Sequence, residues 1–403
     1  MRSFAQMGLC VPELLLPDAP VESSWACVAC DQYTSQPQIW SRLEELVGEK
    51  PSTLRMVLPE CYLSQAEARL PRMLDAMERY QTGVLNRRVR GFVLTRRTTQ
   101  SGSRLGLVLA VDLEAYDFSP DSASPIRATE GTILERLPPR IRVRERASLE
   151  CSHILLLSND PQRTLLEPLY ARLAPHPPLY DLDLPLEGGR LTGWAVQGEE
   201  LERVREALSA LWEQRGRQPF LAVGDGNHSL ATAKAIWQKR GQDAPADHPA
   251  RYAMCELTNL FDPALVFEPI HRCLFSVQPQ ALSRALEPFD GEAASPKTRP
   301  APGQALLCGA GGATLYRSLP LRSLQDLLDR LQGEAFERLD YVHGDRAALE
   351  LGAKPGNAAI LLPAMDKYTL FDAIAGGPLP RKAFSMGQAN EKRYYMECRR
   401  ILP

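Results

Sequence analysis

The chain has 403 residues, of which 44% are hydrophobic and 24% are charged, and its formal net charge is -2 at pH 7. This length suggests roughly two or three domains of about 150 residues. The composition is that of an ordinary globular protein with enough apolar side chains for a large core. A nearly neutral chain has no global attraction to nucleic acid or to a membrane surface, so we expect neither as a partner.

The N-terminus lacks the apolar run of a signal peptide, and no stretch approaches the roughly 18 apolar residues of a membrane span. We therefore expect a soluble cytoplasmic protein that acts on a small-molecule substrate. Its nine cysteines are an odd number, which argues against a disulfide framework. The close pair Cys27 and Cys30 has no helix start directly after it and no second ligand pair, so we interpret both as ordinary semi-buried thiols.

Helix and strand patterns alternate in the first half of the chain. Residues 36–47 predict a helix with Pro37 in its first turn. A second helix is expected from Ser64, which has capping-box spacing to Glu67, towards Tyr80, although Pro71 argues against an unbroken helix. Residues 91–96 and 105–113 predict a hairpin, and residues 153–157 predict a strand, after which residues 159–161 form a helix-start signal.

The second half continues this mixed order. Residues 199–214 predict a helix because Leu201, Val204, Leu208 and Leu211 recur on one face, and residues 220–223 predict a buried strand. A non-periodic segment at 292–303 predicts a linker. We therefore expect an α/β (α+β) fold with a mixed-sheet core at 1–291 and a smaller C-terminal α/β region at 304–403, with a helix at 323–331 and a strand at 359–362.

The most informative segment lies between the strand ending at Val223 and a predicted helix over residues 229–240. It consists of Gly224, Asp225, Gly226, Asn227, His228 and Ser229. A loop of this kind leaves unsatisfied N–H groups at a helix start, where anions bind, and its glycines let a ligand approach the backbone. Asp225 could orient a hydroxyl, a metal or a proton, and His228 could donate to an oxyanion. The alternative is a turn that merely caps the helix.

Two other groups of polar residues could contribute. The loop with Arg127, Thr129, Glu130 and Thr132 offers both a cation and a carboxylate, as phosphoryl transfer requires, so we expect it within about 15 Å of the Asp225 loop, close enough for one ligand to touch both. The alternative is a surface loop whose charges pair with each other.

The second group is a basic segment near the C-terminus, which either binds phosphate or forms a solvated helix end. It contains Arg381, Lys382, Lys392 and Arg393, with Ser385, Gly387 and Asn390 as possible caps of a following helix. His271 and His343 lack metal-ligand spacing and are interpreted as hydrogen-bonded structural residues. Asp31 is a candidate acid or base.

Several motifs together resemble one bacterial family, catalogued as domain of unknown function 1015, over nearly the whole chain. Residues 223–233 resemble its Asp-Gly-His-His-Arg box, and further matching segments lie at 29–35, 127–140, 267–272, 339–344, 380–387 and 391–393.

The box is also similar, over a short stretch, to that of ParB-like and sulfiredoxin-like proteins, including free-serine kinases. This resemblance implies a loop that contacts nucleotide phosphates, with ATP or ADP as cofactor, an accompanying Mg²⁺, and a small hydroxyl compound as acceptor. Ser229 stands where the wider box usually has Arg, which removes a bidentate phosphate contact. Asn227 stands where the box has a His, and its side-chain amide can still donate a hydrogen bond. Arg381 and Lys382 are candidates to supply the missing charge.

Our leading hypothesis is a nucleotide-dependent small-molecule phosphotransferase, such as a kinase of a serine-like hydroxyl compound. Asp225, His228 and Glu130 are its candidate catalytic residues. The predicted nucleotide-binding residues are Gly224, Gly226, Asn227, Ser229, Arg127, Thr129, Arg381 and Lys382, and no residue is predicted to be a dedicated metal ligand. The alternative is a non-catalytic sensor or adaptor that binds a nucleotide or a phosphorylated metabolite. Nucleic-acid binding of the ParB type is disfavoured by the neutral charge.

Overall fold

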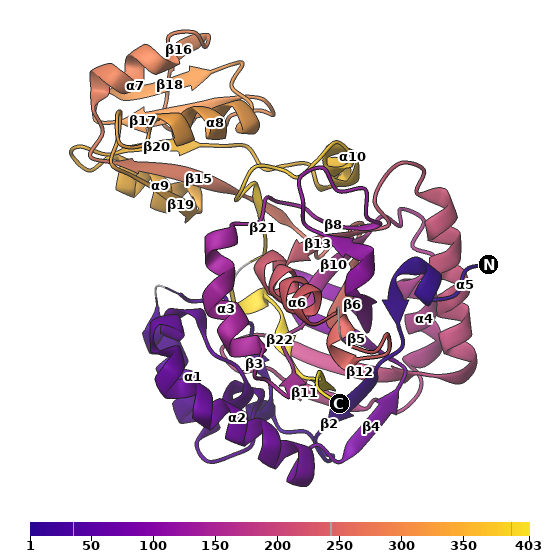
Figure 1. Cartoon of the computed structure of the whole chain (residues 1–403). Helices are drawn as coiled ribbons and strands as arrows, with labels where there is room; N and C mark the ends of the chain where they lie inside the picture. The colour runs from indigo at the N-terminus through magenta and orange to yellow at the C-terminus, as the bar shows by residue number, and fades with distance from the viewer. Residues whose placement is uncertain (35, 242–243, 388) are drawn as a thin grey trace. The chain divides into compact units, whose positions relative to one another are not determined.

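The computed structural model describes residues 1–34, 36–241, 244–387 and 389–403 (Figure 1). The chain divides into two compact units. Unit 1 comprises Met1–Leu265, Phe371–Gly377 and Gly387–Pro403, and unit 2 comprises Val266–Leu370 and Pro378–Met386. Both units combine helices with a β-sheet, so the predicted α/β class is confirmed.

Unit 1 is built on a ten-stranded mixed sheet. Along its path the strands are β11 (Tyr180–Asp183), β12 (Arg190–Val196), β5 (Phe92–Thr99), β6 (Gly102–Asp112), β14 (Tyr252–Asn259), β10 (Ile154–Ser158), β13 (Leu221–Asp225), β8 (Ile126–Ala128) and β7 (Tyr116–Asp117), and β1 (Leu9–Cys10) pairs with β6 off the path. The predicted hairpin is β5–β6, and the predicted strand at 220–223 is β13, which lies between β10 and β8 in the interior of the sheet as expected.

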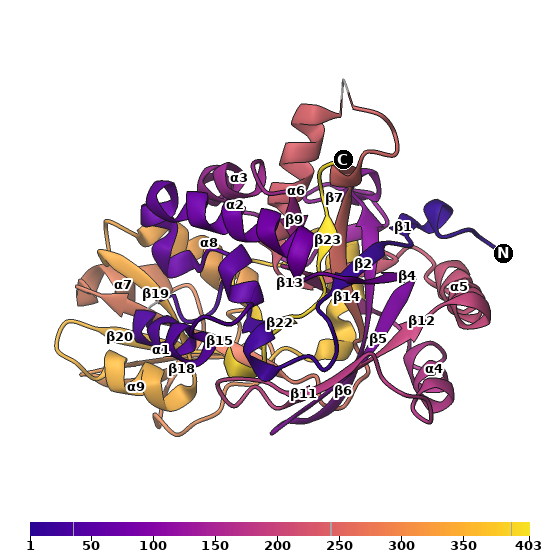
Figure 2. The ribbon, with the colours of Figure 1, turned by 90° about the horizontal axis from the view of Figure 1, so that it is seen from below.

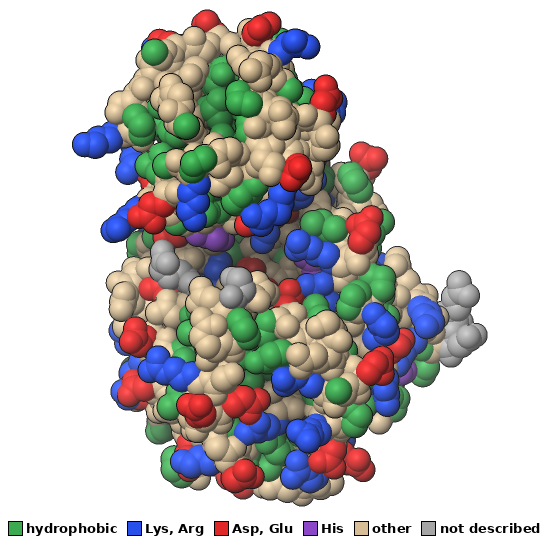
Figure 3. Space-filling view, turned by 90° about the vertical axis from the view of Figure 1, so that its left-hand side faces the viewer, with side chains coloured by type: hydrophobic (Ala, Val, Ile, Leu, Met, Phe, Trp, Pro, Cys, Tyr) green, Lys and Arg blue, Asp and Glu red, His purple; other side chains and the backbone are tan. Residues whose placement is uncertain are grey.

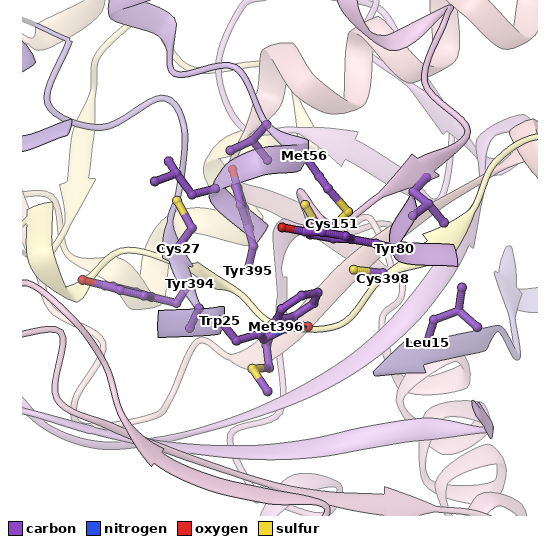
Figure 4. Close-up of a cluster of buried hydrophobic side chains, with 14 of the residues drawn as sticks. Leu15, Trp25, Cys27, Met56, Tyr80, Cys151, Tyr394, Tyr395, Met396 and Cys398 are labelled. Atoms are coloured by element: carbon purple, nitrogen blue, oxygen red, sulfur yellow. Dashed lines mark hydrogen bonds between the residues drawn. The ribbon is translucent and has the colours of Figure 1, made fainter. Parts of the chain in front are cut away.

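Both faces of this sheet are buried. Alternate side chains along a strand point to opposite faces, and those of β6 belong to two different hydrophobic clusters. Leu107, Leu109 and Val111 of β6 belong to one hydrophobic cluster. Val108, between them, belongs to another, which Figure 4 shows in part. Burial on two faces explains why the central strands are continuous apolar runs instead of polar–apolar alternations.

Different helices cover the two faces. The first cluster also holds apolar residues of α4 (Leu166–Leu173), α5 (Gly198–Gln214) and α6 (Asn227–Arg240). The second holds residues of α1 (Pro37–Val47) and α2 (Ala66–Gly83), and α3 (Leu137–Arg144) contacts α6 and α2. Figures 1 and 2 agree that α4 and α5 lie together on the side of the sheet away from α1 and α2.

Three short ladders tie distant parts of the chain into unit 1. β2 (Glu13–Leu16) pairs with β4 (Arg87–Arg90), β3 (Cys27–Val28) with β22 (Tyr394–Tyr395), and β9 (Leu149–Glu150) with β23 (Arg399–Arg400). Tyr394, Tyr395, Met396 and Cys398 are buried in the cluster with Trp25, Met56 and Tyr80 (Figure 4). The segment after residue 387 is therefore part of the core of unit 1.

Unit 2 contains a seven-stranded antiparallel sheet. Its strands are β16 (Gly291–Ala294), β18 (Gly312–Tyr316), β17 (Ala305–Gly309), β20 (Ala358–Leu361), β15 (Phe267–Phe275) and β19 (Arg338–His343), with β21 (Phe384–Met386) on β15. Its helices are α7 (Pro279–Leu286), α8 (Leu321–Leu331) and α9 (Asp345–Gly352), and α10 (Leu370–Ala375) begins at its boundary. The predicted linker at 292–303 lies inside unit 2, and its first residues belong to β16.

Two helix starts differ from the predictions. Ser64 does not cap α2, because residues Glu60–Gln65 form a 3-10 turn and α2 begins at Ala66 without a side-chain cap. α2 nevertheless continues through Pro71, since Leu70, Met73 and Met77 pack into the core. The signal at 159–161 precedes a turn instead of a helix: the Asp160 carboxylate accepts from the N–H groups of Thr164 and Leu165, and α4 begins only at Leu166.

Within the described ranges, no helix is long and apolar enough to cross a membrane. On the face shown in Figure 3, basic and acidic side chains are interspersed. This distribution agrees with the net charge of -2.

Candidate functional site

The loop after β13 has the geometry of a ligand-binding turn. Val223 pairs with Leu156 and Asp225 with Leu155, so the intervening Gly224 is an extra residue, a β-bulge, in β13. Gly226 adopts φ +87°, a left-handed conformation that residues with a Cβ rarely accept. A Cβ at this position would lie 3.4 Å from the Arg393 guanidinium and from Ile154. The left-handed φ therefore favours glycine at position 226.

Helix α6 begins at Asn227, two residues earlier than predicted, so Asn227, His228 and Ser229 form its first turn. No side chain caps this end of the helix. The Ser229 and Leu230 N–H groups donate to the Gly226 carbonyl, while those of Asn227 and His228 precede any helical acceptor. The positive end of the helix dipole and the backbone N–H groups of this first turn together favour an anion at this position.

Arg393 lies beside this helix end, between two carboxylates. Its guanidinium is 2.5 Å from Asp225 Oδ2 and 3.4 Å from Asp31 Oδ2, and its Nε donates to the His153 carbonyl at 2.9 Å. The side chain of Arg393 is 2% exposed, whereas those of Asp31 and Asp225 are 22% and 21% exposed. Burial acts to lower the pKa of Arg393, but the two carboxylates outweigh burial and hold the pKa above its usual range. The guanidinium is therefore permanently charged.

The orientation of Asp225 is fixed from several sides. Its Oδ1 accepts from the Gly226 N–H at 3.0 Å, and Lys392 Nζ lies 3.9 Å from Oδ2. Asp31 has fewer contacts, with Gln32 Nε2 donating to its Oδ1 at 3.0 Å in addition to Arg393. The two carboxylates thus differ: Asp225 is held by two cations and a backbone donor, and Asp31 by one cation and an amide.

The Arg127–Thr132 loop lies next to the Asp225 loop, as predicted, because β8 and β13 are adjacent parallel strands that end on the same edge of the sheet. Thr129 Oγ1 donates to the Val223 carbonyl at 2.7 Å. The Ile133 N–H donates to His228 Nε2 at 3.3 Å, so the imidazole carries its proton on Nδ1. Glu130 follows Thr129 directly in this loop.

Arg127 contacts backbone groups near the start of its loop. It is half-buried, and it donates to the carbonyls of Ser124 at 2.9 Å and Ala375 at 3.3 Å. Both acceptors are backbone groups of unit 1. These contacts stabilise the start of the loop, and the predicted contact between Arg127 and a nucleotide stays a prediction.

The cations of the basic segment are divided between the two units. Arg381 and Lys382 belong to unit 2, where Arg381 donates to the Tyr341 hydroxyl and pairs with Asp329, and the Lys382 carbonyl accepts from Arg272. Their role in nucleotide binding stays a prediction. Lys392 and Arg393, from the same segment, contact Asp225. They do not belong to a solvated helix end, since a 3-10 turn (Ala389–Glu391) and strand β22 flank them.

Cys30, which directly precedes Asp31 in the sequence, contacts Tyr395. The Cys30 N–H donates to the Tyr395 hydroxyl at 3.1 Å, and burial raises the pKa of the Cys30 thiol to about 12. A thiol with such a pKa is a poor nucleophile, which agrees with the interpretation of Cys27 and Cys30 as ordinary thiols. Among the residues that the structure describes, no group of three or more His, Cys, Asp and Glu side chains is arranged to hold a metal ion.

A buried polar network contacts Arg393. The carbonyl of His153 accepts from Arg393, and the His153 ring is 3.0 Å from the Glu256 carboxylate, which also accepts from Thr95. Burial acts to raise the pKa of Glu256, but the hydrogen bond and charge of His153 outweigh it and lower the pKa to about 2. Thr95 and His153 lie in segments that the sequence predicted as strands, whereas no sequence pattern indicated Glu256.

The chain matches the family model described as "Protein of unknown function (DUF1015)" over residues 15–342. This match covers well over half of the 403 residues. The chain belongs to the DUF1015 family. A comparison of this DUF1015 protein with curated proteins gives no match.

Among solved structures, the DUF1015 chain is similar to a free serine kinase in complex with AMP, with 11% identity, a TM-score of 0.42, and coverage of 73% of this chain and 92% of that chain. It is also similar to a conserved hypothetical protein from Pyrococcus furiosus (12% identity, TM-score 0.38, coverage 71% and 93%). A third similar structure is SbnI with C-terminal truncation from Staphylococcus aureus (9% identity, TM-score 0.37, coverage 70% and 82%). Likeness at this level assigns neither an activity nor a ligand to this chain.

Proposed function

We propose that this protein is a nucleotide-dependent phosphotransferase that acts on a small hydroxyl compound, of which serine is one example. The observation that carries the proposal is Arg393, a buried guanidinium held between the carboxylates of Asp31 and Asp225 at the amino end of α6. Cations at an anion-binding helix end, next to a carboxylate that can take a proton, are the groups that phosphoryl transfer requires.

The residues fit a phosphate group. Donors come from the first turn of α6 and from the side chains of Lys392 and His228, and Gly226 leaves open the space that a Cβ would fill beside Arg393. Backbone donors at a helix start bind phosphate without further cost of ordering a side chain. When bound, a nucleoside triphosphate would supply the phosphoryl group, and an accompanying Mg²⁺ would neutralise charge on the phosphate oxygens.

The two carboxylates suit different tasks. Asp225 is fixed by Arg393, Lys392 and the Gly226 N–H, so it suits the orientation of the ligand's cation or of Arg393 itself. Asp31 contacts one cation and is partly exposed, so it is better placed to accept the proton of the acceptor hydroxyl. Glu130, in the neighbouring loop, is the second candidate for this proton.

Binding is tested by calorimetry with ATP, ADP and CTP, each with and without Mg²⁺. We expect the wild type to bind at least one nucleotide and Arg393→Met to bind it at least tenfold more weakly, because a charge-assisted contact is lost. Arg399→Met is the matched control: Arg399 is also buried and ion-paired, but with Glu150. Lys392→Met provides a second variant with a partly exposed side chain. No binding by the folded wild type would overturn the proposal.

Turnover is tested by phosphotransfer to serine and related hydroxyl compounds. We expect Asp31→Asn to lower kcat with little change in nucleotide affinity, since an amide keeps the shape of the carboxylate but cannot take a proton. His228→Ala should instead weaken nucleotide affinity, and Glu130→Gln decides whether Glu130 shares the role of base. Nucleotide binding without turnover on any acceptor would favour the alternative of a non-catalytic sensor.

A further inference from the structure

A partly open cavity of about 100 Å³ lies in unit 1 beside the candidate site. Side chains of α2, of α3 and of the segments that flank them line it, and the wall is largely apolar. Three methionines, Met56, Met73 and Met77, line it together with Val143 and Leu149. Met56 and Cys151, which also lines the cavity, are seen within the hydrophobic cluster in Figure 4.

The polar end of this cavity is formed by the candidate site itself. Ser229 and Thr232, one turn apart on α6, line it, as does Cys30, the residue before Asp31. Asp31 contacts Arg393, which contacts Asp225. A molecule in the cavity would therefore lie against the first turn of α6 and against the segment that carries the proposed base.

The charged groups in the cavity wall are already paired with each other. Glu60 accepts from Arg140, and Arg144 pairs with Glu150. Burial raises the pKa of Glu60 against the opposing effect of Arg140, which indicates a poorly solvated environment. A zwitterionic ligand would place two further charges here without partners, at a large desolvation cost. The cavity therefore favours a neutral, apolar group.

Its size limits that group to a few carbon atoms. An engineered apolar cavity of roughly 150 Å³ is known to accommodate benzene, so about 100 Å³ suits a shorter aliphatic chain. The methionine side chains in the wall are unbranched and adapt to the shape of different apolar ligands.

We propose that this cavity is the acceptor site and that the acceptor is a small alcohol whose short aliphatic portion fills it, with the hydroxyl directed towards Asp31. This inference rests on the proposed phosphotransferase function and specifies its substrate class. It favours an alkyl-bearing alcohol over serine, whose ammonium and carboxylate groups would meet only paired charges in this cavity.

The methionines allow a direct test in the intact protein. With ¹³C-labelled methionine methyl groups, a series of n-alkanols from ethanol to 1-hexanol is titrated without nucleotide. We expect the resonances of Met56, Met73 and Met77 to shift while those of the equally buried Met7, Met254 and Met396 do not. Affinity should rise about fourfold for each added methylene until the cavity is full and then fall. Uniform shifts, or none, would overturn the inference.

Two variants alter the cavity in opposite directions. Ala147→Leu, in the wall, should abolish the methionine shifts and raise the acceptor KM at least tenfold while nucleotide affinity stays unchanged. Ala76→Leu, at a buried alanine of α2 outside the wall, is the matched control for overpacking. Met73→Ala enlarges the cavity and should move the optimum to a longer alkanol. An unchanged optimum in this variant would contradict the proposal even if Ala147→Leu does not fold.

The experiments distinguish a wrong acceptor class from a wrong proposed function, because the two give different results. Nucleotide binding with serine as the preferred acceptor, and no alkanol effect on the three methionines, would overturn the acceptor class alone. Alkanol binding by a protein that binds no nucleotide would overturn the phosphotransferase and, with it, the role of the cavity as an acceptor site.

Discussion

Arg393 is charged, buried and dependent on two carboxylates from other parts of the chain. Taking an ion out of water costs several kcal/mol unless partners compensate for the lost hydration. Removing only Arg393, or only one of its carboxylates, should therefore destabilise the fold more than removing all three charges together.

We predict that Arg393→Met lowers the free energy of unfolding by about 2–4 kcal/mol, somewhat less than for a fully buried pair because Asp31 and Asp225 are partly exposed. Combining it with Asp225→Asn should recover part of this loss, since the second change removes a carboxylate left without its guanidinium. Urea unfolding of both single variants and the double variant measures the coupling. Strictly additive losses would show that the ion pair contributes nothing to stability.

The sequence indicated residues on both sides of this site but not that they contact each other. Asp225, Gly226 and His228 were recognisable because they lie between a buried strand and a helix, so their roles follow from local structure. The contact of Arg393 with Asp31 joins residues 362 positions apart and depends on the closure of the tertiary fold. Tyr394 and Tyr395, which follow Arg393 directly and form a buried strand, lie with it inside the protein.

His271 gives unit 2 a pH-dependent stability. Burial, together with the charges of Arg272 and Arg299, lowers the pKa of His271 to about 4, compared with about 6.5 in the unfolded chain. Between these values the unfolded state binds the proton and the folded state does not, so stability should fall as the pH drops from about 6.5 to 4, by up to about 3 kcal/mol. Hydrogen exchange of β15 and β20 measures this, and His271→Gln should remove most of the dependence. An equal slope in both proteins would assign it to other groups.

At the scale of elements, the connection from β13 to α6 depends on the left-handed conformation of Gly226. Gly226→Ala should cost about 1–2 kcal/mol from the left-handed backbone alone. Gly216, at φ +61° with no atom near its Cβ position, is the matched control, because Gly216→Ala introduces the same kind of strain without a contact to Arg393. We expect similar losses of thermal stability in the two variants but a tenfold or greater loss of nucleotide affinity only in Gly226→Ala. Equal affinities in calorimetry would place the phosphate elsewhere.

The elements were predictable where periodicity was strong and less so where capping decided their ends. α1 and α5 follow their apolar stripes, and β13 follows its apolar run. Ser64 failed as a cap because a preceding 3-10 turn occupies its position, and the helix start at 159–161 failed because Asp160 bonds to a turn. Several local hydrogen-bonding patterns compete at each of these positions, and tertiary packing decides which one forms. The spacing of residues in the sequence alone therefore does not predict the outcome.

At the scale of the whole molecule, unit 1 is completed by a segment that follows unit 2 in the sequence. The predicted linker at 292–303 was inferred from composition, which does not reveal that the chain returns to the first unit. Strands β22 and β23 pair with β3 and β9, and Met396 and Cys398 are fully buried in the core of unit 1.

Deletion of residues 387–403 should therefore unfold the half of unit 1 that contains α1 and α2 while leaving unit 2 intact. Hydrogen exchange with mass spectrometry should show faster exchange in α1, α2 and β3 and unchanged protection in β17 to β20. The deleted segment supplied as a separate peptide should restore protection in part. Equal loss of protection in both units would mean that they fold as one cooperative body.

The same arrangement sets an order of events during synthesis. The loop at Gly226 leaves the ribosome before all of unit 2, and Arg393 follows only after it. At about 5–20 residues per second, this interval lasts roughly ten to thirty seconds. Throughout it, the nascent first unit holds two acidic side chains without the guanidinium that neutralises them, together with an apolar surface that β22 and β23 later cover. The newly made chain is therefore most exposed to chaperones and proteases before the proposed nucleotide site can form.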